Sequence, residues 1–383
     1  MRARLAADGL PVDDLTESNP TRVGLRYPAR VLDSLASSAG LSYQPEPLGL
    51  PSAREAVARD FVRRGLAVPA SRIVLTASTS DAYSVLFKLL CSPGDEVLVP
   101  APSYPLFEFL AKLDAVNVRP YRLDYQGEWV IDASSLAEAT SARTRAVIVV
   151  SPNNPTGSFV KRHELDVLTQ HCRVHELALI GDEVFGDYAL DVDLRRTCSV
   201  LAQCDVLTFS LGGLSKSVGL PQLKLSWMTV SGPEESVESA LGHLELVCDT
   251  YLSVGTPVQE ALADLLERGE VVRTQIRERL AQNLRTLRES VAAHPSVTLL
   301  PVEGGWSAVL QVPATRSEEA LVLDLLERDH VLIHPGYFFD FPREAFLVTS
   351  LLPEPAVFCR AVERVLARCT CQQRSSAVRS SLP

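Results

Sequence analysis

The sequence predicts an α/β protein in which a mostly parallel sheet lies between layers of helices and is followed by a smaller α+β domain. Three observations carry this prediction. Short apolar runs alternate with helical segments from about residue 50 to residue 210, a pattern typical of parallel sheets covered on both faces. Near residue 255 the alternation gives way to a long charged helix and shorter strands. The length of 383 residues exceeds one ordinary domain.

The elements of the larger part follow in order along the chain. Residues 1–30 are rich in Pro, Gly, Asp and Arg, and we expect an arm with little regular structure there. Beyond the arm, helical periodicity marks helices and β-branched composition marks strands. The predicted helices are Ser52–Arg64, Ser80–Cys91, Leu106–Leu113 and Leu165–Cys172. The predicted strands are Arg72–Thr76, Glu96–Val99, Val116–Leu123, Arg145–Val150, Ala178–Ile180 and Val206–Phe209.

The smaller domain begins with a long, charged, amphipathic helix, Glu270–Ala293. Its predicted strands are Thr298–Leu300, Ala308–Gln311, Val331–His334 and Phe346–Thr349, and its further helices lie near Ser317–Arg328 and Glu354–Ala367. We therefore divide the chain into an arm that forms part of the small domain (1–45), a large domain (46–255) and a small C-terminal domain (256–370). Residues 371–383 lack periodicity and are expected to be a disordered tail.

The composition excludes several classes of partner. The net charge of −10 opposes non-specific binding to nucleic acid or to anionic membranes. No apolar run approaches the roughly 18 residues of a membrane span. The eight cysteines form no CxxC pair and no Cys/His cluster with zinc spacing, so we expect free thiols and no bound metal. Free thiols are typical of a reducing compartment, and we predict a cytoplasmic protein.

Lys216 is the first candidate for chemistry. It lies in a stretch of small residues, Ser210–Pro221, and is the only charged side chain between Asp205 and Lys224. A lysine among small and apolar groups can lose its proton near neutral pH and form an imine with a carbonyl compound. The alternative is a lysine whose stem lies over a core segment while its amine reaches water.

Other polar groups follow the predicted strands. Because ligands bind at the carboxyl ends of parallel strands, these groups are expected to lie near Lys216. Each also has a purely structural explanation, because Asn-Pro-Thr-Gly is a good turn and Ser-Thr-Ser is a good helix start. The groups are Asn154, Asp182 and the hydroxyl-rich helix start Ser78, Thr79 and Ser80.

Together these motifs resemble the class I/II aminotransferases, the fold-type-I enzymes that use pyridoxal 5′-phosphate (PLP). The matching stretches are Pro-Ala-Pro-Ser-Tyr-Pro at 100–105, Ser-Pro-Asn-Asn-Pro-Thr-Gly at 151–157, Asp-Glu-Val-Phe at 182–185 and Leu-Ser-Lys-Ser-Val-Gly-Leu-Pro at 214–221. Their order and separations fit the family from about residue 15 to residue 370. The resemblance implies a fold-type-I PLP transferase that moves an amino group from a small-molecule donor to an oxo acceptor.

The resemblance assigns a role to each residue around the cofactor ring. Lys216 would form the Schiff base with PLP and shuttle the proton between Cα and C4′. Asp182 would pair with the pyridinium nitrogen, so that the ring can act as an electron sink. Asn154 would donate to the phenolic oxygen. Tyr104 would stack on the face of the pyridine.

The resemblance also implies a phosphate site and a substrate side. Ser78, Thr79 and Ser80 would supply hydroxyl and N–H donors to the phosphate, and Lys224 falls where most relatives have arginine. Tyr43 resembles the tyrosine that reaches the phosphate of the neighbouring subunit, which implies a homodimer with shared active sites. The residues expected on the substrate side are Ser18, Asn19, Arg22 and Trp306.

Three residues depart from the family pattern. Phe185 stands where many relatives have a tyrosine that donates to the phenolic oxygen, and Gly213 replaces a frequent phosphate-binding serine. Val348 takes the place of the arginine that clamps the substrate α-carboxylate, which a valine cannot do. We therefore expect an atypical carboxylate site, for which Arg22 or Arg26 of the arm is a candidate cation.

Two other functions stay open at this level. The first is a PLP-dependent β- or γ-lyase or a decarboxylase, because substrate placement decides which Cα bond breaks. The second is a non-catalytic, aminotransferase-like ligand-binding protein. Dehydrogenase and P-loop functions are excluded, since the sequence contains neither GxGxxG nor GxxxxGK[ST].

Overall fold

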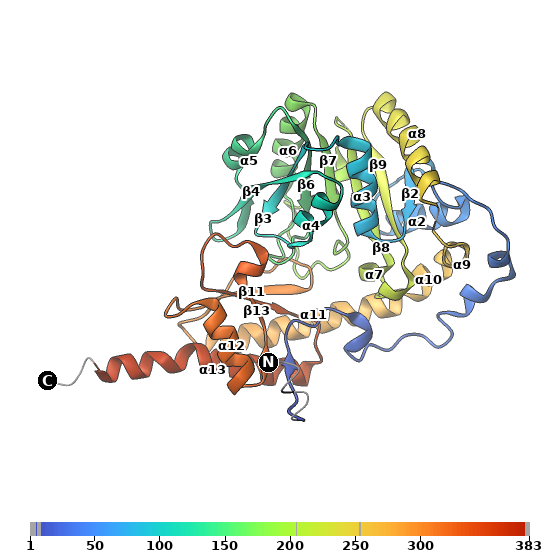
Figure 1. Ribbon diagram of the computed structural model, residues 1–383. Coiled ribbons are helices and arrows are strands. Elements are labelled where there is room, and N and C mark those ends of the chain that lie inside the picture. Colours follow the sequence, from blue (N-terminus) through green and yellow to red (C-terminus); the bar gives the residue numbers. More distant parts are fainter. Residues whose placement is uncertain (1–4, 6–8, 204, 253, 380–383) are drawn as a thin grey trace.

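A mixed sheet of eight strands forms the centre of the protein (Figure 1). A computed structural model describes residues 5, 9–203, 205–252 and 254–379, and for 371–379 it describes the backbone alone. In sheet order the strands are β2 (Ile73–Thr76), β9 (Ser226–Ser231), β8 (Thr208–Gly213), β7 (Ala178–Asp182), β6 (Thr144–Val150), β3 (Glu96–Ala101), β4 (Asn117–Tyr125) and β5 (Trp129–Ile131). Strands β8, β7, β6, β3 and β4 are mutually parallel, whereas β9 and β5 run antiparallel to their neighbours.

Helices cover both faces of this sheet, because successive side chains of a buried strand point to opposite faces. Val97 and Val99 of β3 pack with α3, α4 and α8, whereas Leu98 packs in the cluster that contains α5 and α6. Strands β2 and β9 pack on α2 and α10 through a third cluster that includes Ile73 and Trp227. These helices are α2 (Pro51–Arg63), α3 (Thr79–Leu90), α4 (Leu106–Leu113), α5 (Ala133–Ala139), α6 (Arg162–His175), α8 (Glu234–Tyr251), α9 (Thr256–Glu260) and α10 (Leu262–Arg268).

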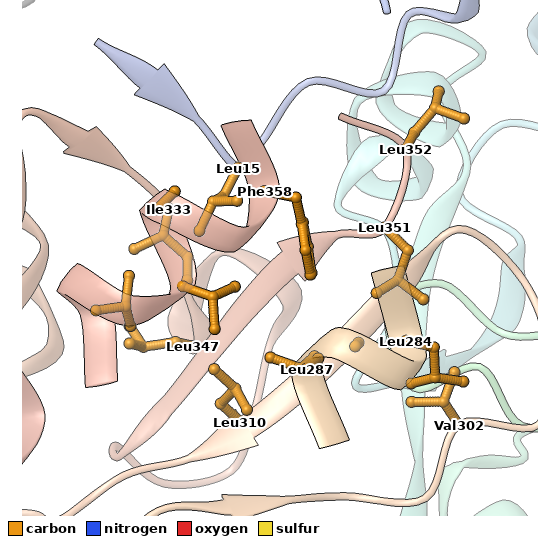
Figure 2. Close-up of a cluster of buried hydrophobic side chains, with 14 of the residues drawn as sticks. Leu15, Leu284, Leu287, Val302, Leu310, Ile333, Leu347, Leu351, Leu352 and Phe358 are labelled. Carbon is orange, nitrogen blue, oxygen red and sulfur yellow. The ribbon is translucent and has the colours of Figure 1, made fainter. Parts of the chain in front are cut away.

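A second, antiparallel sheet lies beside the end of the long helix α11 (Figure 1). Its order is β10 (Thr298–Leu299), β11 (Ser307–Gln311), β14 (Phe346–Ser350) and β13 (His334–Pro335). Helices α11 (Glu270–Ala292), α12 (Glu318–Arg328) and α13 (Pro355–Arg379) pack with it. Figure 2 shows the shared core, to which Leu284 and Leu287 of α11 contribute together with Val302, Leu310 and Phe358.

The N-terminal arm is joined to this second sheet region. Its strand β1 (Asp13–Asp14) pairs in parallel with β12 (Val331–Leu332), and Leu15 is buried in the same core (Figure 2). The carboxylate of Asp13 accepts hydrogen bonds from Arg360 and Arg364 of α13. A short 3₁₀ turn, η1 (Pro20–Arg22), follows. The beginning of the chain is therefore held by segments that lie near its end.

The predicted fold class is confirmed: a large, mostly parallel sheet lies between helices, and a smaller α+β unit follows. Some predicted elements have different bounds. The predicted strand Val331–His334 is two strands, β12 and β13, which pair with different partners. Helix α13 continues to Arg379, so the predicted tail begins inside a helix, and residues 380–383 lie outside the described residues. In the described part of the chain, no helix is both long and apolar enough to cross a membrane.

Candidate active site

Three polar side chains meet at the carboxyl ends of neighbouring strands. Asp182 ends β7, where it pairs with Val150 of β6 on one side and with Leu211 of β8 on the other. Asn154 follows β6 by four residues, and Lys216 lies in α7 (Leu214–Ser217), directly after β8. The register of β6, β7 and β8 therefore places an amide, a carboxylate and an amine at one edge of the sheet.

Asp182 is held by two hydrogen bonds. The hydroxyl of Tyr83, on α3, donates to Oδ2 at 3.1 Å, and the N–H of Val184 donates to Oδ1 at 3.2 Å. Burial raises the pKa of Asp182 to about 6, and these two hydrogen bonds oppose the rise. The carboxylate is thus ionised at neutral pH. Because its burial makes the charged form unfavourable, a cationic partner would stabilise it.

Lys216 shows the opposite shift. Burial lowers the pKa of its amine to about 8, and the charge of Asp182 opposes this change. The charge of each group therefore affects the pKa of the other, although the two make no direct ion pair among the described contacts. A lysine whose pKa is near 8 has an appreciable neutral, nucleophilic fraction at neutral pH.

Aromatic rings surround the amine. Lys216 Nζ lies 4.9 Å from the ring centroid of Trp306 and 5.4 Å from that of Phe185. The rings of Phe185 and Trp306 meet edge to face at 5.3 Å, and Tyr188 packs on Trp306 at the same centroid distance of 5.3 Å. These rings limit the access of water to the amine, and their faces attract its protonated form.

Asn154 is oriented by a residue from the second sheet. Ser307, the first residue of β11, donates from Oγ to Asn154 Oδ1 at 3.2 Å. Because the carbonyl oxygen of the amide is engaged, its NH₂ group is directed away as a donor. The pairing also joins the two sheets at this edge.

The start of α3 lies close to the same edge. Ser78 caps the helix by accepting from the N–H of Asp81 at 3.0 Å, and the N–H groups of Thr79 and Ser80 find no acceptor among the described residues. Such a helix start is suited to an anion. Thr76 pairs with Ser226, so the exposed Lys224, two residues before Ser226, runs alongside this segment.

The close approach of Ser226 explains why position 213 is a glycine. Gly213 pairs with Ser226 across β8 and β9, and a Cβ atom at position 213 would lie 2.3 Å from Ser226 Oγ. A serine at 213 would therefore require Ser226 to move.

Two predicted cofactor residues are not brought together with this group. Tyr104 follows β3 and is 47% exposed; it lines a cavity of about 470 Å³ with Phe107, Glu108 and Asp340, and neither Asp182 nor Lys216 is among the described lining residues. Tyr43 is 75% exposed on the surface of the single chain.

The N-terminal arm contacts the segment that follows Lys216, residues 217–221, which we call the lysine loop. The hydroxyl of Tyr27 donates to the carbonyl of Gly219 at 2.6 Å. Asn19 accepts from the N–H of Thr21 at 3.0 Å, so its side-chain oxygen caps η1. Ser18 and Arg22 are exposed. The arm therefore passes close to Lys216, and Ser18 and Arg22 carry no side-chain bond among the described contacts.

Val348 lies in the middle of β14, paired with Val309 and His334. It is 1% exposed and belongs to an apolar cluster with Phe339, Phe341 and Phe346. The guanidinium of Arg343 is stacked over the Phe346 ring at 5.5 Å.

Three residues at this site are absent from the predicted set: Tyr83, Tyr188 and Ser307. A buried tyrosine needs an acceptor for its hydroxyl, and the placement of Tyr83 on the inner face of a predicted helix could have indicated one. Tyr188 and Ser307 give no such signal, because their partners lie in distant parts of the sequence.

Comparison with known proteins agrees with this arrangement. A family model described as aminotransferase class I and II matches residues 13–357. Glutamate-pyruvate aminotransferase AlaA of Escherichia coli K12 is 27% identical over 347 residues, which cover 88% of this chain and 85% of that protein. Alanine aminotransferase of Mycobacterium tuberculosis H37Rv is 27% identical over 379 residues, covering 95% of this chain and 86% of that protein.

Solved structures of aminotransferases have the same fold. The crystal structure of an aminotransferase from Escherichia coli superposes with a TM-score of 0.84 at 25% identity, over 95% of this chain and 92% of that one. The family model spans most of the sequence, and the resemblance seen in the motifs is confirmed. The chain therefore belongs to the aminotransferase class I and II family, and it is a PLP-dependent transaminase.

Proposed function

We propose that this protein exchanges an amino group between a small-molecule amino donor and an oxo acceptor, with PLP attached to Lys216 as a Schiff base. The observation that carries the proposal is the coupled pair of Asp182 and Lys216, whose pKa values shift in opposite directions at one edge of the sheet. Pairs of titratable groups with shifted pKa values are typical of acid–base sites.

The residues present fit the cofactor. The buried carboxylate of Asp182 suits a protonated ring nitrogen, and the NH₂ group of Asn154 suits a phenolic oxygen. The free N–H groups at Thr79 and Ser80, with Lys224 alongside, suit a phosphate. The buried Nε1 of Trp306 has no acceptor among the described residues, and a bound substrate or cofactor would provide one.

PLP, when bound, supplies an electron sink for charge that develops at the substrate Cα. Asp182 would hold a proton on the ring nitrogen, and the desolvation of its carboxylate would strengthen that pairing. Lys216 Nζ, with a pKa near 8, can both take and return a proton at neutral pH. Phe185 and Trp306 exclude water from this transfer.

The test is an absorbance titration of the protein saturated with PLP, using a panel of amino acids and amines. A donor that converts the cofactor to its amine form, with an equal amount of aminated acceptor formed afterwards, supports transfer. Free ammonia or carbon dioxide would instead support the lyase or decarboxylase. Borohydride reduction followed by peptide mapping should place the cofactor on Lys216, and labelling elsewhere would contradict the assignment.

We propose further that the substrate site is atypical because Val348 offers no cation. The support is its burial among Phe339, Phe341 and Phe346. Arg22 and Arg26 of the arm are exposed, and we propose them as cations that could bind a substrate carboxylate instead.

Matched donors test this site. An amino acid and the amine that lacks only its carboxylate should differ in kcat/KM by less than about tenfold. An arginine at position 348 would favour the amino acid through a charged hydrogen bond worth roughly 1.5–3 kcal/mol, and Val348 cannot make that bond. A preference of a thousandfold for the amino acid would contradict the proposal. A smaller preference for the amino acid that disappears in Arg22→Ala would identify Arg22 as the cation that binds the carboxylate.

Ser307→Ala tests the link between Ser307 and Asn154. The variant frees the amide of Asn154 to rotate, so PLP affinity should fall about two- to tenfold, the equivalent of one hydrogen bond. Equilibrium dialysis of PLP against the cofactor-free protein measures this change. Ser34→Ala is the control, because it removes a hydroxyl that is unpaired among the described residues and lies in the arm. Equal affinities for both variants would contradict the role of Ser307.

We propose a homodimer with shared active sites. Tyr43 and several other large apolar side chains are exposed in the single chain, and a second copy of this chain is the partner that we assign to cover them. The exposed residues are Leu41, Tyr43, Tyr251 and Leu252.

Mixed dimers test the sharing of sites. Tyr43→Ala and Lys216→Ala should each have little activity alone. After the two are unfolded and refolded together in equal amounts, about one quarter of wild-type activity should return, because half of the dimers then contain one intact site. Failure to recover activity, with dimers present by light scattering, would place Tyr43 outside the partner's site.

The predicted division into an arm (1–45), a large PLP-binding domain (46–255), a small domain (256–370) and a tail (371–383) stays a proposal. It is supported by the two separate sheets and by the pairing of β1 with β12. A cytoplasmic location is likewise proposed, supported by six cysteines that are free thiols in the described residues.

A further inference from the structure

The backbone of Lys216 is held from behind by a buried tyrosine. Helix α7 is a single turn of four residues, so its last carbonyl groups have no partners within the helix. The hydroxyl of Tyr188 donates to the carbonyl of Lys216 at 2.6 Å and is 3.1 Å from that of Ser217. Tyr188 is fully buried, so its hydroxyl has no water to bond in place of these carbonyls.

The same tyrosine also reaches the region of the amine. Its ring packs edge to face on Trp306 at 5.3 Å, and Trp306 in turn lies 4.9 Å from Lys216 Nζ. One side chain therefore contacts the lysine at its carbonyl group and supports the ring against which the amine lies. A residue with only a packing role would not need the hydroxyl at this point.

Arg273 of α11 holds the next residue. Its Nε donates to the carbonyl of Ser217 at 3.1 Å, and its Nη2 donates to Ser217 Oγ at 2.9 Å. The hydroxyl of Ser217 in turn donates to Asp187 Oδ2 at 2.9 Å. Arg273 is 1% exposed, and its charge is balanced by Asp187, Asp60 and Glu270.

The start of α11 is also pressed against the lysine loop. A Cβ atom on Gly269, the residue before α11, would lie 2.5 Å from Val218 Cβ. Helix α11 belongs to the core of the second sheet through Leu284 and Leu287. The turn that carries Lys216 is thus anchored to an element of the other sheet on two sides.

We propose that Tyr188 and Arg273 are positioning residues that fix the backbone of Lys216 and Ser217, so that the amine is held against Trp306 at the edge where Asp182 lies. The inference rests on the proposed role of Lys216. Asp182 is the charged group that acts on the amine, whereas Asp187 and Arg273 contact the carbonyl side of the turn. Without the clamp, the turn would relax and the amine would gain contact with water.

Tyr188→Phe tests the clamp, because it removes the hydroxyl and keeps the ring on Trp306. Tyr121→Phe is the matched control. Tyr121 is equally buried, and its hydroxyl donates to the backbone carbonyl of Ile148 at 2.9 Å, a bond of the same kind that does not involve Lys216.

The readout is the pH dependence of acetylation at Lys216 in cofactor-free protein, followed by mass spectrometry. Wild type should reach half its maximal rate near pH 8. Tyr188→Phe should shift this midpoint upward by about half to one pH unit, the equivalent of one hydrogen bond, and Tyr121→Phe should keep the wild-type profile. An unchanged profile in Tyr188→Phe, or an equal shift in both variants, overturns the proposal.

Arg273→Lys is a second variant that retains the charge near Asp187 but loses the two-pronged contact with Ser217. It should shift the acetylation midpoint in the same direction as Tyr188→Phe, while Ser217→Ala, which keeps the backbone carbonyl, should shift it less. Equal midpoints in Arg273→Lys and wild type would remove Arg273 from the proposal.

The failure of this inference can be told from failure of the proposed function. If borohydride never traps PLP on wild-type Lys216, the proposed function is wrong, whereas the acetylation profiles of cofactor-free protein still decide the role of Tyr188. If trapping succeeds and Tyr188→Phe acetylates like wild type, only the positioning role is wrong.

Discussion

Lys216→Ala is expected to lower the rate of amino transfer by a factor of about 10⁴ to 10⁶, because a single amine serves both as the attachment point and as the proton carrier. The binding of PLP should persist more weakly through the α3 start and Asn154. Single-turnover absorbance with excess donor measures the rate of the half-reaction.

Small primary amines provide a sharper readout for the same variant. They should partly restore proton transfer in Lys216→Ala, where the cavity left by the side chain admits them, but not in Lys216→Arg, where the guanidinium fills that space and stays protonated. Lys112→Ala is the control, since Lys112 is exposed and paired with Glu108. If Lys216→Ala keeps more than a hundredth of wild-type activity, another base must act.

Asp182→Asn is expected to lower the rate by about a thousandfold, similar to the loss of one preorganised electrostatic contact in a water-excluded site. An amide cannot hold the proton on the ring nitrogen as a carboxylate does. The amide oxygen can still accept from the N–H of Val184, and the amide NH₂ can donate to the hydroxyl of Tyr83, which then accepts, so the geometry should be retained. Single-turnover kinetics with the PLP-loaded variant test this expectation.

The same variant should make the cofactor-free protein more stable at neutral pH. Burial raises the pKa of Asp182 from 3.8 to about 6. The folded state therefore binds this proton more tightly than the unfolded state does, and stability from this group falls as pH rises from about 4 to about 6. At pH 7 the penalty approaches about 3 kcal/mol, and asparagine removes it.

Urea unfolding of the cofactor-free proteins measures the effect. The advantage of Asp182→Asn over wild type should be largest at pH 7 and should shrink toward pH 4. Asp193→Asn is the control with the opposite sign, because Arg195 holds the pKa of Asp193 at about 2. If Asp182→Asn is less stable than wild type at pH 7, then Asp182 is already stabilised by its neighbours in the absence of PLP.

The parts of the fold that the sequence predicts are those with local patterns. The run Arg145–Val150 and the turn after it predict β6 and the position of Asn154, because apolar strands and Asn-Pro-Thr-Gly turns need no distant partner. Helix α8 also carries a helical pattern, with Val237, Ala240 and Leu244 on one buried face, and could have been predicted. Strand β9 could not, since Ser226, Thr229 and Ser231 are polar side chains buried by their neighbours.

The residues of the active site also fall into those that a local motif predicts and those that depend on distant contacts. Lys216 and Asp182 are identifiable because their chemistry is tied to strand ends. The role of Ser307 depends on contact between two sheets, and that of Tyr188 depends on a carbonyl 28 residues away. Tyr104 shows the converse, because its motif is intact while the cavity that it lines has neither Asp182 nor Lys216 among its described lining residues. Motifs specify which groups are present, whereas packing decides which way they point.

The pairing of Asp13 with Val331 has a consequence for synthesis on the ribosome. The partner strand leaves the exit tunnel more than 300 residues after the arm does, a delay of about 15 to 60 seconds at about 5–20 residues per second. During that interval Leu15 has no core to enter, and the nascent arm is open to chaperones and proteases. Emergence of β12, rather than folding of the first sheet, is therefore expected to be the step that protects the beginning of this polypeptide.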